Sequence, residues 1–276
     1  MLLAQLTDTH IRAPGSLAYG VVDTAAFLER AVAHLAARAP RPDALIVTGD
    51  LTDFDRPEEY ARFKALTAGL PMPIFPIPGN HDSTQGLAVA FPHIAARGQG
   101  GKLNYVVDDF ALRLVMLDSS VPDAPYGLLG GETLAWLDAA LAVAPDRPSL
   151  VALHHPPFLT GIRHMDVQNL QDASALEAVL GRHHHVLALV CGHVHRTVLT
   201  SFAGRPASIC PSPAHAVSLD LDPEAHPTFH LEPPGVHLHR FAGGGLVTHL
   251  DFIGAYDGPH RFFDADNQML DGTVRD

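Results

Sequence analysis

The stretch Leu2-Leu3-Ala4-Gln5-Leu6-Thr7-Asp8-Thr9-His10 joins a short apolar run directly to an Asp-x-His pair. The same arrangement recurs along the chain, with short runs rich in Val, Ile and Leu that each end in a polar cluster. These runs are Ala44–Val47 before Gly49-Asp50, Pro73–Ile77 before Gly79-Asn80-His81-Asp82, Leu112–Leu117 before Asp118, Leu150–Leu153 before His154-His155, and Val186–Val190 before Gly192-His193. Apolar runs of this length are typical of strands that are buried on both faces.

Stretches with helical periodicity separate these runs. Four are predicted, from Thr24 to Arg38, from Pro57 onward, around Leu134–Leu141 and around Leu176–Leu180. Strands that alternate with helices indicate an α/β protein. In such sheets ligands bind beyond the carboxyl ends of the strands, where the polar clusters of this sequence fall. The pattern therefore predicts one site built from many strand ends.

The pattern changes after about residue 200. Glycine-containing turns at Gly204-Arg205-Pro206 and Gly243-Gly244-Gly245 lie between apolar segments and predict two hairpins, within Thr197–Ile209 and Gly235–Ile253. We therefore predict a catalytic domain over residues 1–200 and a small β-rich extension over residues 201–276.

The composition limits the possible partners and location. The chain has 276 residues and a formal net charge of −12, which argues against a nucleic-acid polymer as partner because such surfaces are rich in Lys and Arg. No apolar run approaches the roughly 18–20 residues that a membrane span needs, so no membrane association is expected. With no secretory signal and only two cysteines, we expect a cytoplasmic protein with reduced thiols.

Seven polar residues at the strand ends are candidate metal ligands. They are Asp8, His10, Asp50, Asn80, His154, His193 and His195. The two Asp/His-x-His pairs have a spacing of two, which points both side chains of each pair the same way on an extended segment. Oxygen and nitrogen donors without thiolate favour Fe, Mn, Co or Zn. Two Asp and four His are too many for one tetrahedral ion, so we predict two divalent ions that share one carboxylate.

The charge of such a site suits a phosphodiester. Two dications carry four positive charges, and Asp8, Asp50 and a bridging hydroxide neutralise three of them. The remaining charge of about +1 matches the single negative charge of a diester. Paired ions can clamp the attacking and leaving oxygens, and a metal can lower the pKa of its bound water towards roughly 7. We therefore expect a metal-bound hydroxide to attack phosphorus, without a protein nucleophile.

The same residues allow other interpretations. Each pair alone is common as a surface pair or a turn, but together the pairs supply a complete two-metal set at predicted strand ends. Within enzymes, a phosphomonoesterase or a nucleotide pyrophosphatase with the same site is the alternative. A non-catalytic scaffold of the same fold is a further alternative, although every ligand position is filled.

These motifs resemble those of the calcineurin-like metallophosphoesterases, and more narrowly those of class III cyclic-nucleotide phosphodiesterases and bacterial glycerophosphodiesterases. The resemblance covers nearly the whole chain. It implies a two-sheet α/β sandwich and hydrolysis of 3′,5′-cyclic nucleotides or glycerophosphodiesters. It also implies ligand roles: Asp8, His10 and His195 bind the first ion, Asn80, His154 and His193 the second, and Asp50 bridges the two.

Other positions receive roles only from the resemblance. His81 contacts the phosphate and assists the leaving group, while Asp82 and His155 orient ligands and His215 lies near the site. The family's close members form dimers or larger assemblies through a β-rich C-terminal extension, so a homo-oligomer is expected here. The loop Val121–Gly127 lacks the Ser and Lys expected from the glycerophosphodiesterases.

Overall fold

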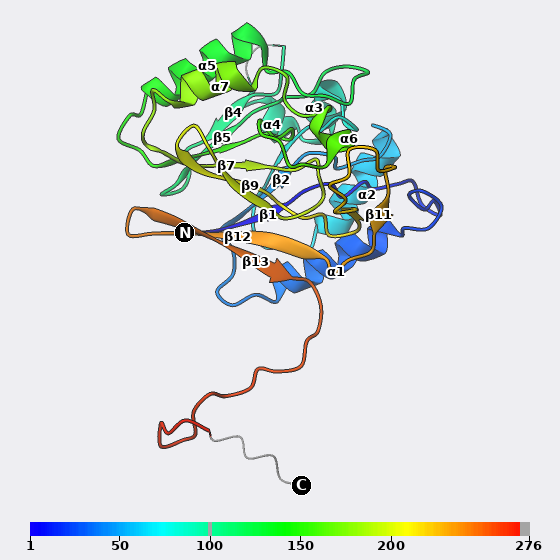
Figure 1. The fold of residues 1–276 in the computed structure, drawn as a ribbon, viewed down its shortest axis with the longest axis vertical. Helices are drawn as coiled ribbons and strands as arrows, with labels where there is room; N and C mark the ends of the chain where they lie inside the picture. The colour runs from blue at the N-terminus through cyan, green and yellow to red at the C-terminus, as the bar shows by residue number, and fades with distance from the viewer. Residues whose placement is uncertain (99–100, 271–276) are drawn as a thin grey trace.

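The computed structural model describes residues 1–98 and 101–270. Two β-sheets pack face to face, and helices cover the outer side of each (Figure 1). The five-stranded sheet consists, in spatial order, of β13 (Gly245–Phe252), β12 (Gly235–Ala242), β1 (Leu2–Leu6), β2 (Ala44–Thr48) and β3 (Ile74–Ile77). In this sheet β1, β2 and β3 are parallel, and the hairpin β12–β13 is added antiparallel to β1.

The six-stranded sheet carries the second half of the chain. Its spatial order is β4 (Tyr105–Val107), β5 (Arg113–Met116), β6 (Ser149–Ala152), β7 (Val186–Cys191), β9 (Arg205–Ile209) and β8 (Val198–Phe202). The four inner strands are parallel, and the edge strands β4 and β8 are antiparallel to their neighbours. A short pair, β10 (Ala216–Val217) with β11 (Phe229–His230), lies outside both sheets.

The helices lie between the strands in the sequence. They are α1 (Thr24–Ala36), α2 (Pro57–Thr67), α3 (Thr84–Ala90), α4 (Pro92–Ala95), α5 (Gly130–Ala142), α6 (Arg163–Asp166) and α7 (Ala173–Leu180). Pro57 begins α2, where its missing N–H costs no helical hydrogen bond. No helix in the described part of the chain is both long and apolar enough to span a bilayer.

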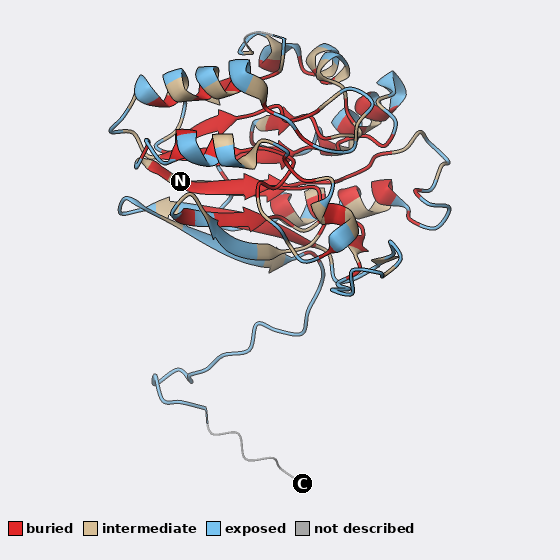
Figure 2. Cartoon of the chain, turned by 45° about the horizontal axis from the view of Figure 1, so that its top comes forward, coloured by how far each residue is buried: buried red, intermediate tan, exposed pale blue. Residues whose placement is uncertain are grey.

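Two apolar cores explain why the strands are buried on both faces. Along β5, Leu114 and Met116 point into the core between the sheets, whereas Val115 points into the core beneath α5 and α7. Side chains alternate along a strand, so a continuous apolar run fills both cores. Figure 2 shows the resulting buried strands in the middle of the molecule and the exposed edge strand β13 at its margin.

The predicted two-sheet α/β fold and both predicted hairpins are confirmed. The strands after residue 200 extend the sheets: β9 pairs with β7, and β12 pairs with β1. Residues 255–270 leave this body as an extended segment (Figure 1). The separate function of residues 201–276 stays a prediction.

Candidate metal centre

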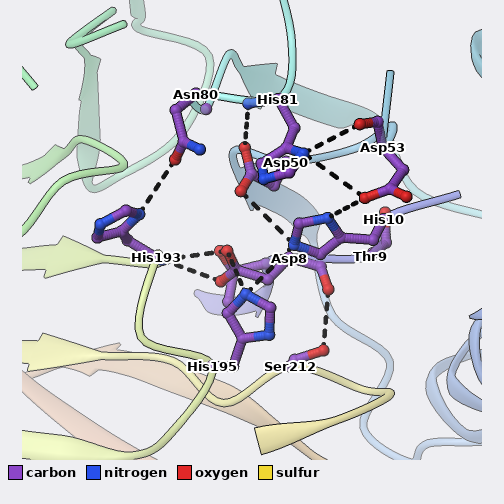
Figure 3. Close-up of polar contacts among 12 residues, drawn as sticks. Asp8, Thr9, His10, Asp50, Asp53, Asn80, His81, His193, His195 and Ser212 are labelled. Atoms are coloured by element: carbon purple, nitrogen blue, oxygen red, sulfur yellow. Dashed lines mark hydrogen bonds and ion pairs between the residues drawn. The ribbon is translucent and has the colours of Figure 1, made fainter. Parts of the chain in front are cut away.

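The seven predicted ligand residues lie together at the carboxyl ends of strands from both sheets. Asp8 and His10 follow β1, Asp50 follows β2 and Asn80 follows β3. In the other sheet, His154 follows β6, and His193 and His195 follow β7. Figure 3 shows most of these side chains pointing into one space. Because strands of both sheets have their carboxyl ends here, residues more than 180 positions apart in the sequence, such as His10 and His195, become neighbours.

One group of four residues matches the predicted first site. Asp8, His10, Asp50 and His195 each place a possible ligand atom within 4.8 Å of the others, and all four are buried. The Nε2 atoms of His10 and His195 are 3.2 Å apart. The Nε2 atom of His10 lies 3.5 Å from a carboxylate oxygen of Asp50, and that of His195 lies 3.5 Å from one of Asp8.

A second group surrounds the amide oxygen of Asn80. This Oδ1 atom lies 3.2 Å from Nε2 of His154 and 3.1 Å from Nδ1 of His193. The Nε2 atom of His154 is also 3.4 Å from a carboxylate oxygen of Asp50. Asp50 therefore lies between the two groups, the position that a bridging ligand requires.

The hydrogen bonds of three histidines show that the two groups suit cations. His10, His154 and His195 each direct Nδ1 at an oxygen: Asp53 Oδ1 at 3.0 Å, the Thr48 carbonyl at 2.7 Å and the His215 carbonyl at 3.2 Å. Neutral imidazoles held this way donate from Nδ1 and turn the lone pair of Nε2 inward. The inward atoms are then imidazole lone pairs and oxygens of Asp8, Asp50 and Asn80, and acceptors converge in this way around a metal.

Unusual backbone conformations also occur at the candidate ligand residues. Five of the seven residues have positive φ angles, which are uncommon outside glycine: Asp8 at 53°, His10 at 42°, Asp50 at 50°, His193 at 75° and His195 at 57°. Such backbones typically cost about 1–3 kcal/mol each and cluster at functional sites. The local strain is therefore concentrated in the predicted ligands.

Gly49 shows why a glycine precedes Asp50. Its φ is +99°, and a Cβ atom there would lie 2.3 Å from Nδ1 of His154. A side chain at this position would displace the imidazole that donates to Thr48. The absence of a side chain at Gly49 therefore lets the end of β2 pack directly against the ring of His154.

Burial and neighbouring charges shift the pKa values of the carboxylates in opposite directions. Burial raises the pKa of Asp8 to about 6, against the opposing effect of His154. For Asp50 burial also acts to raise the pKa, but His154 and His81 outweigh it and hold the pKa well below its usual value. His154 is the counterpart: burial opposes protonation, yet Asp50 raises its pKa to about 9. Without a metal, the protonated ring of His154 therefore compensates the negative charge of Asp50.

His81 lies beside the two groups. Its Nδ1 is 3.0 Å from the carbonyl oxygen of Asp53, and its backbone N–H donates to Asp50 at 2.9 Å. The carboxylate of Asp53 accepts from His10 and, at 2.7 Å, from Arg12. Sequence reasoning missed Asp53, whose only signal is its position three residues after Asp50.

The three residues predicted to support the site are also close to it. Asp82 is buried and accepts backbone N–H groups of Leu51, Thr52 and Gly79, which ties the loop after β3 to the segment after β2. His155 packs its ring 4.8 Å from those of His154 and His193, and Ser119 Oγ lies 2.8 Å from its Nδ1. The ring of His215 is 4.5 Å from that of His195.

A cleft of about 350 Å³ opens over the candidate ligands. Its rim carries Tyr19 and Phe229, whose rings pack 5.1 Å apart, each 5.3 Å from the ring of His215. Neither aromatic residue was singled out from the sequence. No Lys or Arg lines this cleft among the described residues.

Comparison with known proteins identifies relatives over the whole chain. The calcineurin-like phosphoesterase family matches residues 1–197. A probable glycerophosphodiester phosphodiesterase GpdQ of Arcobacter nitrofigilis is 41% identical over 273 residues, covering 98% of this chain and 100% of the relative. The 3′,5′-cyclic adenosine monophosphate phosphodiesterase CpdA of Vibrio vulnificus is 31% identical and covers 90% of this chain and 88% of its own.

The fold also recurs among solved structures. A dimetal phosphatase from Danio rerio superposes with a TM-score of 0.64 over 90% of this chain and 98% of its own, at 15% sequence identity. At this identity the likeness supports the two-sheet architecture.

Proposed function

We propose that this chain, which belongs to the calcineurin-like phosphoesterase family, hydrolyses small phosphodiesters at a centre of two divalent metal ions. The names of its relatives support glycerophosphodiesters and 3′,5′-cyclic nucleotides as substrates. The observation that carries the proposal is the convergence of imidazole lone pairs and carboxylate oxygens on one space below a cleft.

The two groups described above support one assignment of the ligands. Asp8, His10 and His195 would hold one ion, Asn80, His154 and His193 would hold the other, and Asp50 would be shared between them. Nitrogen and oxygen donors without thiolate suit Fe, Mn, Co or Zn. Divalent ions bound here supply an activated water and neutralise charge on the phosphate.

The surroundings of His81 support a role for this residue at the departing oxygen. Its Nδ1 donates to the Asp53 carbonyl, which leaves Nε2 directed away from the backbone, and about a third of the side chain is exposed. The carboxylate of Asp53, 3.5 Å from Nδ1, compensates a positive charge on the ring. We propose that protonated His81 donates to the leaving oxygen, a role that needs a group within hydrogen-bond reach.

The cleft favours a diester over a monoester. A dianionic monoester gains from additional cationic side chains, and the cleft lining contains neither Lys nor Arg among the described residues. The aromatic rim and the volume of about 350 Å³ fit a small phosphate ester with an organic substituent. The phosphomonoesterase and nucleotide pyrophosphatase alternatives therefore gain no support from the site.

We further propose a homo-oligomer formed through residues 201–276. β13 is an edge strand that exposes Val247, Leu250 and Phe252, and the segment beyond it exposes Phe262 and Met269. Exposed edges with apolar side chains are sites of association. A reducing, cytoplasmic location is supported by Cys191 and Cys210, which are both buried and unpaired.

Metal analysis combined with a turnover panel tests the proposed function. The panel compares cyclic AMP, glycerophosphoethanolamine, a nitrophenyl phosphate monoester and bis-nitrophenyl phosphate. We expect about two metal equivalents and a clear preference for diesters, and we expect Asp50→Ala to lose both metal and turnover. A preference for the monoester would overturn the substrate class, and full activity of metal-free Asp50→Ala protein would overturn the mechanism.

A further inference from the structure

A second cavity adjoins the metal centre and is not used by the mechanism above. It has a volume of about 630 Å³ and shares Asn80 and His81 with the cleft. Its other walls are the beginning of α3 and the segment Ser120–Pro125 that follows β5. We call this cavity the loop pocket. A group bound there lies beside His81, the residue proposed to serve the departing oxygen.

The loop that forms the pocket is held at both ends. The Nζ atom of Lys102 donates to the carbonyl oxygen of Ser120 at 2.8 Å and to that of Leu128. The backbone N–H of Leu128 also donates to Ser119 at 2.9 Å, which closes the base of the loop.

Inside the loop, Val121 and Ala124 form a bridge, and the prolines at 122 and 125 restrict the backbone. Gly127 packs so closely that a Cβ atom would lie 2.5 Å from the ring of His155. The pocket is therefore preformed, which lowers the entropic cost of binding.

The lining of the loop pocket is polar without being basic. Neither Lys nor Arg lines it among the described residues, and its only aromatic ring is that of His81. The described lining therefore offers no cation to a second phosphate or a carboxylate, and no ring besides that of His81 to a nucleobase. The cleft on the other side of His81 differs, because Tyr19 and Phe229 form its aromatic rim.

Most acidic groups of the pocket are already satisfied. The Asp55 carboxylate accepts from Tyr60 at 2.7 Å and from the Ser83 backbone at 2.8 Å, and Asp82 is occupied by backbone N–H groups. Asp123 is different: it is exposed, has a φ of 59°, and its carboxylate has no hydrogen-bond or ion-pair partner among the described residues. The left-handed backbone at Asp123 is part of the fixed loop.

We propose that the loop pocket binds one alcohol substituent of the phosphodiester and selects polar substituents without negative charge, with Asp123 as the specificity-determining residue that favours an ammonium group. This inference rests on the proposed diesterase function and adds the class of substituent. An ammonium beside Asp123 gains charge attraction, a hydroxyl can hydrogen-bond to Asp123 or Gln85, and a carboxylate meets repulsion without any compensating cation.

Three diesters of similar size test the proposal. Each joins p-nitrophenol through phosphate to a second alcohol whose terminal group is an amine, a hydroxyl or a carboxylate (3-aminopropyl, 3-hydroxypropyl and 2-carboxyethyl esters, whose terminal groups do not close a five-membered ring at phosphorus). For the metal-loaded wild type we expect kcat/KM to fall in that order. Partly solvated charge pairs are weak, so we expect kcat/KM to differ by about three- to tenfold between one ester and the next. Release of nitrophenol measures every reaction.

Substitutions at Asp123 give the decisive readout. Asp123→Asn removes the preference for the amine over the hydroxyl, and Asp123→Lys reverses the order in favour of the carboxylate, with metal content unchanged. Asp146→Asn, an equally exposed carboxylate in the turn between α5 and β6, keeps the wild-type order. Unchanged ratios in Asp123→Lys would refute the role of the pocket. Failure of metal-loaded wild type to hydrolyse any diester would instead refute the proposed function.

Discussion

The Nδ1 atom of His154 lies 2.7 Å from the main-chain carbonyl oxygen of Thr48. Thr48 ends β2 of one sheet and His154 follows β6 of the other, so the contact joins the sheets at the candidate site. It also fixes Nδ1 as the donor and turns Nε2 towards Asn80 and Asp50. A backbone carbonyl that sets the tautomer in this way is a common support of metal-binding histidines.

Replacement of His154 by alanine is expected to remove about one metal equivalent and to lower kcat/KM for a diester at least about 100-fold, because the second ion loses a ligand. Metal analysis and diester turnover measure both effects. The control is His184→Ala, an exposed histidine just before β7, at the end of that strand opposite the candidate ligands, which should behave as wild type. Two full metal equivalents in His154→Ala protein would contradict the assignment.

Gly49→Ala is expected to lower the free energy of unfolding by about 2–4 kcal/mol. The new Cβ atom would collide with the His154 ring, and alanine disfavours the φ of +99°. Urea denaturation measures the loss. Gly69→Ala, where a Cβ atom would meet nothing within 4 Å, should change the stability by no more than about 0.5 kcal/mol. Equal stabilities of the two variants would count against the close approach at Gly49.

Metal removal is expected to lower the thermal unfolding midpoint. Ions that bind only the folded state stabilise it by about 2.7 kcal/mol when free metal is 100 times the dissociation constant, which corresponds to a shift of roughly 5–10 °C. Chelation followed by metal addition, monitored by calorimetry, gives the difference. The response should be much smaller in Asp50→Ala protein, since the shared carboxylate is gone. An identical response in that variant would show that metal binds elsewhere.

Lowering the pH is expected to reduce the free energy of unfolding, because His239 is a buried histidine on β12. Burial lowers its pKa in the folded protein to about 3, whereas an unfolded histidine titrates near 6.5. Between these values the unfolded chain binds the proton and the folded chain does not, so lowering the pH favours unfolding. From pH 7.5 to pH 5 the loss from this residue is about 2 kcal/mol.

The variant His239→Gln isolates that contribution. Glutamine keeps a donor and an acceptor for Gln5 and Thr248, the partners of His239, but cannot take up the proton. The stability advantage of wild type over the variant should therefore shrink by about 2 kcal/mol between pH 7.5 and pH 5. Urea denaturation at both pH values measures it. His249→Gln, at an exposed position on β13, is the control and should show no such change. An advantage that is independent of pH would contradict the buried neutral state.

Much of this arrangement could be predicted from local sequence. The apolar runs ending in polar pairs located the strands and brought Asp8, Asp50 and His193 to one edge, because parallel strands share the edge at their carboxyl ends. The positions of α1, α2, α5 and α7 followed from periodicity, whereas the short helices α3, α4 and α6 were not predicted.

The remainder depends on contacts that local sequence does not encode. The pairing of β12 with β1 joins residues more than 230 positions apart, and nothing in either strand specifies the other. Asp53 looks like a turn residue until the fold places it beside His10. Tyr19 comes from a turn before α1 and Phe229 from β11, and the two form a rim only when the fold brings these distant segments together. Lys102 likewise supports the loop pocket from outside the loop itself.

The five left-handed backbones among the ligand residues have an evolutionary consequence. At about 1–3 kcal/mol each, their combined cost rivals the 5–15 kcal/mol by which a typical domain is stable. Glycine at these positions would relieve that strain, so thermodynamics alone favours losing the ligands. Selection for chemistry must retain them. A lineage that abandons catalysis is therefore expected to replace these five residues first, while the two sheets and their cores persist as an inactive scaffold.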